Sequence, residues 1–311
     1  MNGFNLKNYP LVSIIFPCWN RKNDTLECLE SLEKLNYPKE KLEIIIADNG
    51  STDGSQGAIK KKFQQMKPQG WLRLVLVENK ENLGHSAGTN RAYEKILSDA
   101  KYILKLDNDV VLASDSLIKS VEEMEKDKKI GVLGGKVFNY NKPNVPTACD
   151  GAAFVNFYTG RIHFINSKEP IICDHVTGCY FLVRKEAINS YFFNEDFFMY
   201  LDDVDFTLKI KKKGYKIVYN PEIKIWHKVP VSPIAKAKSR FVLYYVIRNR
   251  LLLEKKNARF YHKIFFYPFF LFISTPHFFL QSIFSKKIHK IPVHLKATKD
   301  FLFRKWSKQE I

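Results

Sequence analysis

The feature that most constrains the fold is the alternation of short apolar segments with amphipathic segments through the first third of the chain. Each apolar segment has the length and composition of a buried strand. The four segments are residues 11–16, 42–47, 72–77 and 102–106. Apolar residues at helical spacing fill the intervening residues 24–35, 55–65 and 86–97. Repeated strand–helix units predict an α/β fold with a Rossmann-like, mostly parallel sheet and helices on both faces.

A cluster of polar residues follows each of the four predicted strands. These clusters are residues 17–21, 48–53, 79–85 and 107–109. In parallel α/β sheets, ligands bind beyond the carboxyl ends of the strands. Because the four clusters share one rim of the predicted sheet, we interpret them as parts of one binding site.

The fourth cluster, residues 107–109, has the sequence Asp-Asn-Asp. Alternate residues of an extended segment point the same way, so Asp107 and Asp109 can converge. Two convergent carboxylates repel each other unless a cation lies between them. Mg²⁺ or Mn²⁺ carrying a diphosphate fits, because these ions prefer oxygen ligands. The alternative is an Asp-Asn turn between two strands.

The second cluster continues to residue 55 and has the sequence Asp-Asn-Gly-Ser-Thr-Asp-Gly-Ser. Asp48 stands where carboxylates of nucleotide-binding sheets bind a ribose hydroxyl, and the N–H of a nucleobase is a second candidate donor. The alternative is a tight turn in which Asp53 or Ser55 caps the following helix. The chain contains neither GxGxxG nor GxxxxGK[ST], which argues against an NAD enzyme and a P-loop NTPase.

An acidic segment, residues 202–205, begins a predicted helix over residues 203–213 that Gly214 closes. One interpretation is structural, with Asp202 as the N-cap and the other two acids favoured by the helix dipole. Capping needs one side chain, however, and this segment supplies three aspartates. In direct displacement at a sugar carbon, one carboxylate must take the proton of the acceptor hydroxyl.

Around that helix, the sequence predicts further short strands. Residues 139–174 are rich in Pro, Asn and Gly, which predicts loops with short antiparallel strands. Residues 178–184 and 216–219 have strand-like composition, and a third strand-like segment, residues 222–225, follows Pro221.

Positive charge is concentrated in the last third of the chain. Residues 1–206 hold 26 Lys and Arg against 28 Asp and Glu, whereas residues 207–311 hold 24 against 4. The net charge of +18 therefore arises in the last third, which predicts an anionic surface as partner. Residues 234–257 and 293–306 have helical patterns within this basic region.

Residues 264–284 form an aromatic, nearly uncharged stretch that is long enough to span a bilayer. Its two prolines and several polar residues favour a segment lying in the membrane interface, with flanking lysines on anionic phosphates. Nucleic acid is the competing partner, but the aromatics form one apolar block and no nucleic-acid motif occurs. We therefore expect peripheral attachment to an anionic membrane and no nucleic-acid partner, with one membrane span as the less favoured alternative.

Cysteine usage and the N-terminus predict a cytosolic location. The five cysteines are odd in number and lie in no metal-binding spacing, which is typical of reduced thiols. Residues 1–7 lack the apolar core of a signal peptide. We therefore expect the first domain to lie at the cytoplasmic face of the membrane.

Over residues 10–257, an ordered set of motifs resembles the family 2 glycosyltransferases of the GT-A fold. The motifs are VSIIFP with WNR (12–21), ADNGSTDGS (47–55), NLGHSAGTN (82–90), DND (107–109), MYLDDVDF (199–206), GY (214–215), WH (226–227) and YYxxRN (244–249). The chain looks most like the rhamnosyltransferase-type and galactofuranosyltransferase-type enzymes of cell-surface polysaccharide assembly.

The resemblance implies a division of the chain into two domains. Residues 1–233 form the GT-A glycosyltransferase domain, with a nucleotide-sugar half over about residues 10–112 and an acceptor half over residues 113–233. Residues 234–311 form a basic, aromatic helical extension that associates with the membrane.

The resemblance also implies roles for individual residues. Asp107, Asp109 and His227 hold the metal, and Asp203 is the catalytic base. The acceptor-binding residues are Asp202, Asp205 and Trp226. The nucleotide-sugar-binding residues are Pro17, Trp19, Asn20, Arg21, Asp48, Asn49, Asn82, His85, Asp107, Asn108 and Arg248. His85 departs from the family, in which the residue after Asn-Leu-Gly is usually apolar.

These roles predict an inverting glycosyltransferase that depends on Mn²⁺ or Mg²⁺. It moves a sugar from a UDP- or dTDP-linked donor to a lipid-linked or oligosaccharide acceptor in cell-surface glycan synthesis. One alternative is a sugar-phosphate nucleotidyltransferase, but residues 17–21 do not form the Gly-rich, basic loop of that class. The other is a non-catalytic GT-A-like module that docks on membranes; a scaffold, however, gains little from so much buried like charge.

Overall fold

The computed structural model of the protein describes residues 9–147, 150–188, 191–228, 240–306 and 309. Three predictions concern residues outside this set: the N-terminal segment 1–7, Cys149 and the domain boundary at residues 233–234. The other four cysteines are buried and free; they are Cys18, Cys28, Cys173 and Cys179.

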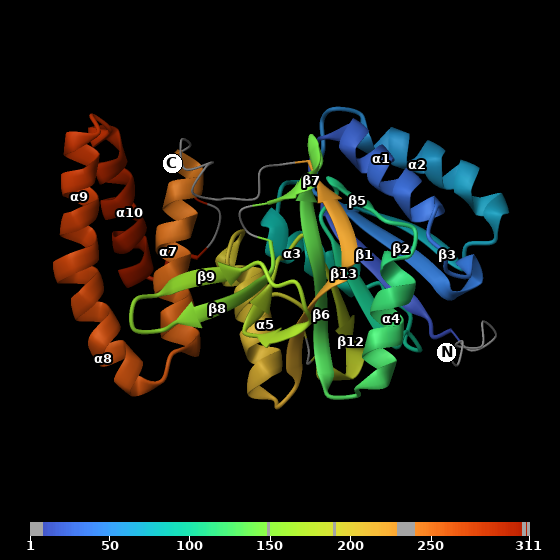
Figure 1. Ribbon diagram of the computed structural model, residues 1–311. Helices are drawn as coiled ribbons and strands as arrows, with labels where there is room; N and C mark the ends of the chain where they lie inside the picture. Colours follow the sequence, from blue (N-terminus) through green and yellow to red (C-terminus); the bar gives the residue numbers. More distant parts are fainter. Residues whose placement is uncertain (1–8, 148–149, 189–190, 229–239, 307–308, 310–311) are drawn as a thin grey trace.

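The four predicted strands are present and parallel, and they form one half of the main sheet (Figure 1). In spatial order they are β4 (Tyr102–Leu106), β1 (Val12–Cys18), β2 (Leu42–Asp48) and β3 (Arg73–Glu78). The helices between them are α1 (Lys22–Glu33), α2 (Ser55–Met66) and α3 (Gly84–Tyr93), the last beginning two residues and ending four residues earlier than predicted. The predicted α/β fold with a mostly parallel sheet is therefore confirmed.

Strand order identifies the rim at which a ligand binds. From β1 the chain proceeds outward to β2 and β3, and then returns to place β4 on the other side of β1. Such a switch point leaves a crevice beyond the carboxyl ends of the two central strands. The end of β1 leads into residues 19–21, and the end of β4 leads into residues 107–109, so two of the predicted polar clusters meet at this point.

The second half of the chain extends the same sheet beyond β4. Strand β12 (Tyr180–Arg184) runs antiparallel between β4 and β6 (Ile130–Asn139), and β13 (Lys216–His227) runs parallel to β6. Shorter strands complete the sheet: β5 (Val110–Leu112), β7 (Lys142–Pro146) and β10 (Ile171–Cys173). A separate three-stranded sheet contains β11 (His175–Val176), β8 (Ala152–Asn156) and β9 (Arg161–Ile165). The helices of this half are α4 (Ser116–Lys126) and α5 (Asp202–Lys212).

Strand β13 is one strand of 12 residues, where the sequence predicted two short ones separated by Pro221. The pairing register with β6 shifts between Asn220 and Lys224. Proline lacks a backbone N–H, and an irregularity of this kind accommodates it inside a sheet. Because the strand continues through the irregularity, it carries His227 to the rim, where β5 places Val110 opposite it.

Alternate residues of the central strands fill two separate cores. Ile14, Ile44 and Leu104 belong to one hydrophobic cluster, whereas their neighbours Ile15, Ile45 and Ile103 belong to another. This division follows from the two-residue period of a strand, which sends successive side chains to opposite faces. The sheet is therefore covered on both faces.

The C-terminal helices form a layer beside the sheet domain (Figure 1). They are α7 (Arg240–Asn257), α8 (Phe260–Pro268), a π-helical segment (Phe269–Ser274), α9 (Thr275–Phe284) and α10 (Ile291–Leu302). A third core joins this layer to the sheet domain, because Phe197 and Val204 pack in one cluster with Leu251 and Phe266. Residues 260–284 form a continuous helix that is long and apolar enough to cross a membrane by length and composition.

Glu254 of α7 is fully buried in this layer, and both of its carboxylate oxygens lack a hydrogen-bond partner among the described residues. Burial raises the pKa of Glu254 to about 8, although the charges of Arg250 and Lys263 oppose the shift. Tyr267 is also close enough to interact with it electrostatically. The folded state therefore keeps a proton that the unfolded chain loses near its ordinary pKa of about 4.5.

We expect Glu254→Gln to raise the free energy of unfolding at pH 8 by about 2 kcal/mol, because stability in the wild type falls as pH rises from about 4.5 to 8. Urea unfolding at pH 4.5 and pH 8 measures the effect, which should be small at the lower pH. Glu123→Gln on the surface of α4 is the matched control. An equal shift at both pH values would contradict the assignment of a protonated Glu254.

Candidate active site

Asp107, Asp109 and His227 gather at the rim as predicted for a metal site. Their candidate ligand atoms all lie within 4.8 Å of one another. The Nε2 atom of His227 lies 2.9 Å from Oδ1 of Asp109, and Nδ1 of His227 is buried without a partner among the described residues. Two carboxylates and one imidazole form a donor set that suits Mn²⁺ and also accommodates Mg²⁺. The residues present therefore fit a divalent cation.

Two cations of the chain itself balance the charge of these carboxylates. Nζ of Lys105 lies 2.5 Å from Oδ1 of Asp107, and Nη1 of Arg21 lies 2.7 Å from Oδ2 of Asp109. Burial alone raises the pKa of Asp107, but the charges of Lys105 and His85 outweigh it and hold that pKa well below its usual range. Asp107 is therefore an anion at neutral pH, which a metal ligand must be.

The end of β2 provides a carboxylate with one free oxygen. Oδ2 of Asp48 accepts hydrogen bonds from the backbone N–H of Ser51 at 3.0 Å and from Nε2 of Gln56 at 2.6 Å. Its other oxygen, Oδ1, is buried and has no hydrogen-bond partner among the described residues. A buried acceptor without a donor costs free energy, so this oxygen is suited to a ligand N–H or O–H.

The loops at the rim are organised by asparagine side chains. Asn20 accepts a hydrogen bond from the N–H of Thr52, and Asn49 donates to the carbonyl of Gly84. Asn82 accepts from the N–H of Gly84, and Asn108 donates to the hydroxyl of Thr25. These asparagines therefore connect the rim loops to one another.

Three other predicted nucleotide-binding residues lie where β1 ends. Pro17 is the sixth residue of β1, and Trp19 follows the strand with 53% of its surface exposed. Arg21 and the preceding Asn20 both have positive φ angles, 60° and 58°. Such left-handed backbone is uncommon outside glycine and clusters at functional sites.

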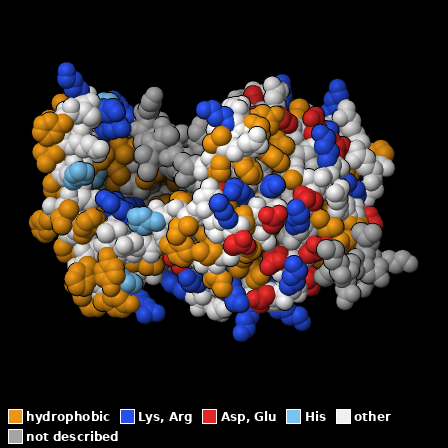
Figure 2. Space-filling model, in the orientation of Figure 1, with side chains coloured by type: hydrophobic (Ala, Val, Ile, Leu, Met, Phe, Trp, Pro, Cys, Tyr) orange, Lys and Arg blue, Asp and Glu red, His pale blue; other side chains and the backbone are white. Residues whose placement is uncertain are grey.

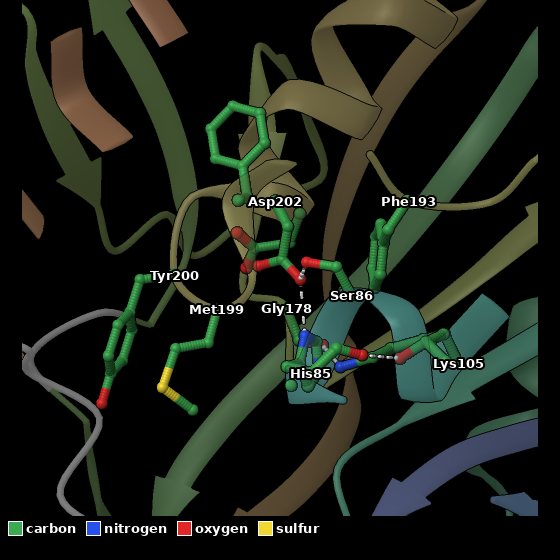
Figure 3. A network of polar contacts seen from close by, with 12 residues as sticks. His85, Ser86, Lys105, Gly178, Phe193, Met199, Tyr200 and Asp202 are labelled. Atoms are coloured by element: carbon green, nitrogen blue, oxygen red, sulfur yellow. Dashed lines mark hydrogen bonds and ion pairs between the residues drawn. The ribbon is translucent and has the colours of Figure 1, made fainter. Parts of the chain in front are cut away.

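Asp202 and Asp203 open helix α5 at the same rim. Oδ2 of Asp202 accepts hydrogen bonds from Nδ1 of His85 at 2.6 Å and from the hydroxyl of Ser86 at 2.9 Å (Figure 3). Oδ2 of Asp203 lies 3.6 Å from Nε2 of the buried His175. A Cβ atom at Gly178 would lie 2.0 Å from the same Asp203 oxygen, so the absence of a side chain there lets the loop before β12 approach this carboxylate.

His85 joins the candidate metal-binding carboxylate Asp107 to Asp202 of α5. Its Nε2 atom lies 3.4 Å from Oδ1 of Asp107, while Nδ1 contacts Asp202. Burial and the charge of Lys105 lower the pKa of His85, but the two carboxylates outweigh them and raise it to about 9. His85, the residue that departs from the family pattern, therefore carries a positive charge and contacts both Asp107 and Asp202.

The pKa values of the two neighbouring acids, Asp202 and Asp203, are shifted in opposite directions. Burial raises the pKa of Asp203, and the carboxylate of Asp202 adds to that shift while His175 opposes it. In contrast, the pKa of Asp202 is lowered, because His85 outweighs the effect of burial. A carboxylate whose pKa moves toward neutrality accepts a proton more readily, so Asp203 is the better base of the two.

The backbone before α5 is strained and is held in place by helix α7. Phe198, Tyr200 and Leu201 all have positive φ angles, between 61° and 66°, which cost free energy in residues with a Cβ atom. The side-chain amide of Asn249 donates to the carbonyls of Phe197, Met199 and Tyr200 at 2.7–2.9 Å. Helix α7 therefore fixes the loop that positions Asp202 and Asp203.

Arg248 of α7 also holds the loop before α5, and its side chain is fully buried. Its guanidinium donates to the carbonyls of Asp196 and Phe197, to the carbonyls of Lys305 and Trp306, and to the side chain of Asn249. These bonds engage all five N–H groups of the guanidinium. The predicted role of Arg248 in nucleotide-sugar binding stays a prediction, but these contacts support a positioning role rather than a contact with the donor diphosphate.

We expect Arg248→Lys to lower the free energy of unfolding by about 2–3 kcal/mol, because a lysine keeps the charge but cannot satisfy five fixed carbonyl and amide partners. The affinity for UDP should stay within about twofold at temperatures where both proteins are folded. Thermal unfolding and calorimetry measure the two quantities separately. A large loss of UDP affinity in the folded variant would support the original diphosphate contact.

Two predicted acceptor-binding residues contact other parts of the protein. Asp205 is fully buried, where it accepts a hydrogen bond from Asn257 of α7 at 2.7 Å and pairs with Lys209. Trp226 donates to the carbonyl of Pro143 and stacks on Phe138, on the opposite side of β13 from His227. The structure thus supports structural roles for both.

The sequence interpretation gave no role to several residues that contact the site, and three of them hold its acids. They are Lys105 beside Asp107, His175 beside Asp203, and Gln56 on Asp48. Lys105 did carry a signal, because a lysine inside a buried strand requires an anionic partner. His175 and Gln56 carried none, since their roles depend on long-range packing.

Comparison with known proteins agrees with this geometry. The model of the family "Glycosyl transferase family 2" matches residues 13–192, more than half of the chain. The chain belongs to glycosyltransferase family 2. It is therefore an enzyme of the glycosyltransferase class, which sets aside the nucleotidyltransferase and the non-catalytic alternatives.

The individual relatives are distant in sequence but align with most of this chain. An uncharacterized glycosyltransferase of Methanocaldococcus jannaschii is 25% identical over 300 residues, covering 93% of this chain and 97% of that protein. The poly-beta-1,6-N-acetyl-D-glucosamine synthase of Staphylococcus aureus is 24% identical over 222 residues, covering 70% of this chain and half of that synthase.

Two solved structures share the fold. A crystal structure of residues 1–349 of S. aureus TarS has a TM-score of 0.61 at 19% identity and covers 94% of this chain and 80% of that one. A mannosyltransferase from Pyrobaculum calidifontis, in complex with GDP-Man and Mn²⁺, has a TM-score of 0.55 at 18% identity and covers 97% and 89%. The GT-A glycosyltransferase fold predicted from the sequence is thus confirmed.

Proposed function

We propose that this glycosyltransferase is an inverting, metal-dependent enzyme that moves a sugar from a UDP- or dTDP-linked donor to a lipid-linked or oligosaccharide acceptor in cell-surface glycan synthesis. The observation that carries the proposal is the bridge made by His85. It contacts Asp107 of the metal cluster and Asp202 of the acceptor acids, so the donor and acceptor halves of the reaction meet at one point.

On the donor side, Asp107, Asp109 and His227 would hold the cation, with Mn²⁺ or Mg²⁺ as the candidates. A bound cation supplies Lewis-acid stabilisation of the leaving diphosphate. The chain's own residues bind and orient the donor: the free oxygen of Asp48 accepts the N–H of uracil or thymine. Lys105 donates one hydrogen bond to Asp107, which keeps that carboxylate ionised and in place, and a second to the carbonyl of Gly178.

On the acceptor side, Asp203 takes the proton of the attacking hydroxyl. Asp202 binds the acceptor beside it, held by His85 and Ser86. The acceptor oxygen forms a bond to the anomeric carbon as the bond to the diphosphate breaks, which inverts the configuration at that carbon. No nucleophile of the protein is needed, because the acceptor attacks directly.

The nucleotide preference tests the donor assignment. We expect calorimetry with Mn²⁺ to give an affinity for UDP or dTDP at least tenfold above that for GDP, because Asp48 matches the N–H of uracil or thymine. Asp48→Asn should lower the UDP affinity about tenfold, since an unpaired buried partner costs roughly 1–3 kcal/mol. Equal affinity for all nucleotides, unchanged by Asp48→Asn, would rule out this base contact.

A further inference from the structure

Helices α8 and α9 expose an apolar face that the glycosyl-transfer reaction does not use. Phe265, Phe272 and Phe284 are 61%, 72% and 83% exposed, although large aromatic side chains normally seek burial. Six more apolar side chains of this helical stretch are exposed: Phe260, Ile264, Leu271, Ile273, Leu280 and Ile283. A contiguous apolar face of this kind marks a surface that meets another molecule or a membrane.

The π-helical segment Phe269–Ser274 keeps this face on one side. The residues that pack inward are spaced by four or by eight: Phe266, Phe270, Phe278 and Ser282. In a regular α-helix of 3.6 residues per turn, a spacing of four drifts by about 40° at each step. The wider π-turn offsets that drift, so the inner residues stay against the protein and the outer residues stay exposed along all 25 residues.

The ends of this helix are basic. Residues 255–299 contain nine Lys and Arg and no Asp or Glu. Arg259 and Lys263 lie where α7 leads into α8, and Lys286, Lys287 and Lys290 lie between α9 and α10. Figure 2 shows hydrophobic and basic side chains over these helices, while acidic side chains gather over the sheet domain. The face therefore complements a surface that is both apolar and anionic.

A shallow apolar hollow of about 420 Å³ opens on the same face. The turn between β8 and β9 forms one wall through Tyr158, and Phe265 and Phe272 form the other. Tyr158 and Phe265 meet edge to face at 5.8 Å. A hollow lined almost wholly by apolar groups suits a hydrocarbon chain.

Packing on the inner side argues that the helix lies along a membrane. His294 of α10 stacks on Phe270 and contacts Phe278, and Arg250 of α7 lies over Phe266. A helix held along its length by neighbours cannot cross the bilayer unless they enter it too. Helix α10 carries Lys296, Lys299 and Asp300, which is costly at the centre of a bilayer.

We propose that the exposed face of α8–α9 docks on the surface of an anionic phospholipid bilayer. The helix lies in the interface, with its aromatic side chains at headgroup depth and the lysines at its ends on lipid phosphates. One acyl chain enters the hollow beside Tyr158. This docking does not depend on which sugar or acceptor the enzyme uses.

Vesicle flotation of the full chain tests the proposal without any activity measurement. We expect binding to vesicles of 70% phosphatidylcholine and 30% phosphatidylglycerol, and at least tenfold weaker binding to phosphatidylcholine alone. Binding should weaken at 0.5 M NaCl, because salt screens the charges, and carbonate at pH 11 should release the protein. Equal binding to both vesicle types that resists salt and carbonate would overturn the proposal in favour of a membrane span.

Two sets of variants separate the apolar contribution from the charge contribution. Phe272→Ser with Phe284→Ser should lower binding about tenfold or more. Ile172→Ser should have no effect, because Ile172 is an exposed apolar residue on β10, outside these helices. Lys286→Gln, Lys287→Gln and Lys290→Gln together should lower binding to anionic vesicles about tenfold to a hundredfold. The charge control is the same number of Lys→Gln changes at Lys60 and Lys61 of α2 and at Lys67, which directly follows it.

Three further outcomes would overturn the proposal. One is that both sets of Lys→Gln changes weaken binding equally, which would mean that the net charge of the protein alone explains the attraction. The second is a stable dimer in light scattering that Phe272→Ser with Phe284→Ser dissociates, with no vesicle binding. The third is tight RNA binding without lipid binding. Circular dichroism confirms that each variant is folded.

Discussion

Replacing Asp203 with asparagine should lower the rate of sugar transfer by about 10³-fold, within the range of general-base catalysis. Asparagine is nearly isosteric and keeps the side-chain oxygen that accepts from the N–H of Val204 at 2.9 Å, so helix α5 should form normally. It cannot accept the proton of the acceptor hydroxyl. The measurement is kcat with saturating donor and acceptor, together with the melting temperature and the affinity for the donor nucleotide.

The control for this change is Asp127→Asn. Asp127 pairs with Lys216 at 2.7 Å, next to the start of β13 and far along that strand from His227, so its loss should leave kcat within twofold. Near-normal transfer by Asp203→Asn would refute the assignment of the base. Loss of stability without loss of specific activity would identify Asp203 as a helix-capping residue only.

Replacing Asp109 with asparagine should abolish most of the dependence of nucleotide binding on the cation. Asp109 contributes one of the two carboxylates of the cluster and is in contact with His227. An amide is a weaker ligand for a divalent cation than a carboxylate. We expect the affinity for UDP in the presence of Mn²⁺ to fall by about 10²-fold and transfer by about 10²–10³-fold, as measured by calorimetry and initial rates.

Arg21 complicates this result because it also pairs with Asp109, at 2.7 Å. Asp109→Asn leaves that guanidinium without its partner. Arg21→Gln removes the pair but keeps the carboxylate, so it should preserve the stimulation of UDP binding by Mn²⁺. If Arg21→Gln and Asp109→Asn have equal effects on that stimulation, the ion pair and not the metal explains the loss.

The sequence was sufficient to predict the strands and the polar residues at the rim, because both depend on local patterns. Apolar runs of strand length specified the parallel half of the sheet, and polar residues at their ends specified where Asp48 and Asp107 would lie. The membership in glycosyltransferase family 2, which the ordered motifs suggested, is also confirmed. The roles proposed for Asp203 and His227 stay predictions, although the structure places both residues at the rim.

The sequence interpretation was less successful where it placed neighbouring residues of one motif in the same site. Asp203 and Asp205 are two positions apart on a helix, so they cannot face the same way, and only Asp203 lies beside the site. Trp226 and His227 are neighbours in a strand and must point to opposite faces. The periodicity of a helix separates Asp203 from Asp205, and that of a strand separates Trp226 from His227.

Arg248 could not have been placed from the sequence. It stands in a basic helix, where a charge on the surface is the ordinary expectation. Its actual partners are backbone carbonyls of residues 196–197 and 305–306, which no side-chain pattern reveals. The same holds for His85, whose two carboxylate partners lie directly after β4 and at the start of α5, distant from it in sequence.

The most direct test of the account is turnover of a nucleotide sugar by the full chain. Purified enzyme is incubated with UDP-, dTDP- and GDP-linked sugars and a lipid-linked or oligosaccharide acceptor fraction, and the released nucleoside diphosphate is measured. We predict release from a UDP- or dTDP-linked sugar that stops with a chelator and returns with Mn²⁺ or Mg²⁺. Release at full rate in the chelator, or release only from a GDP-linked sugar, would contradict the account.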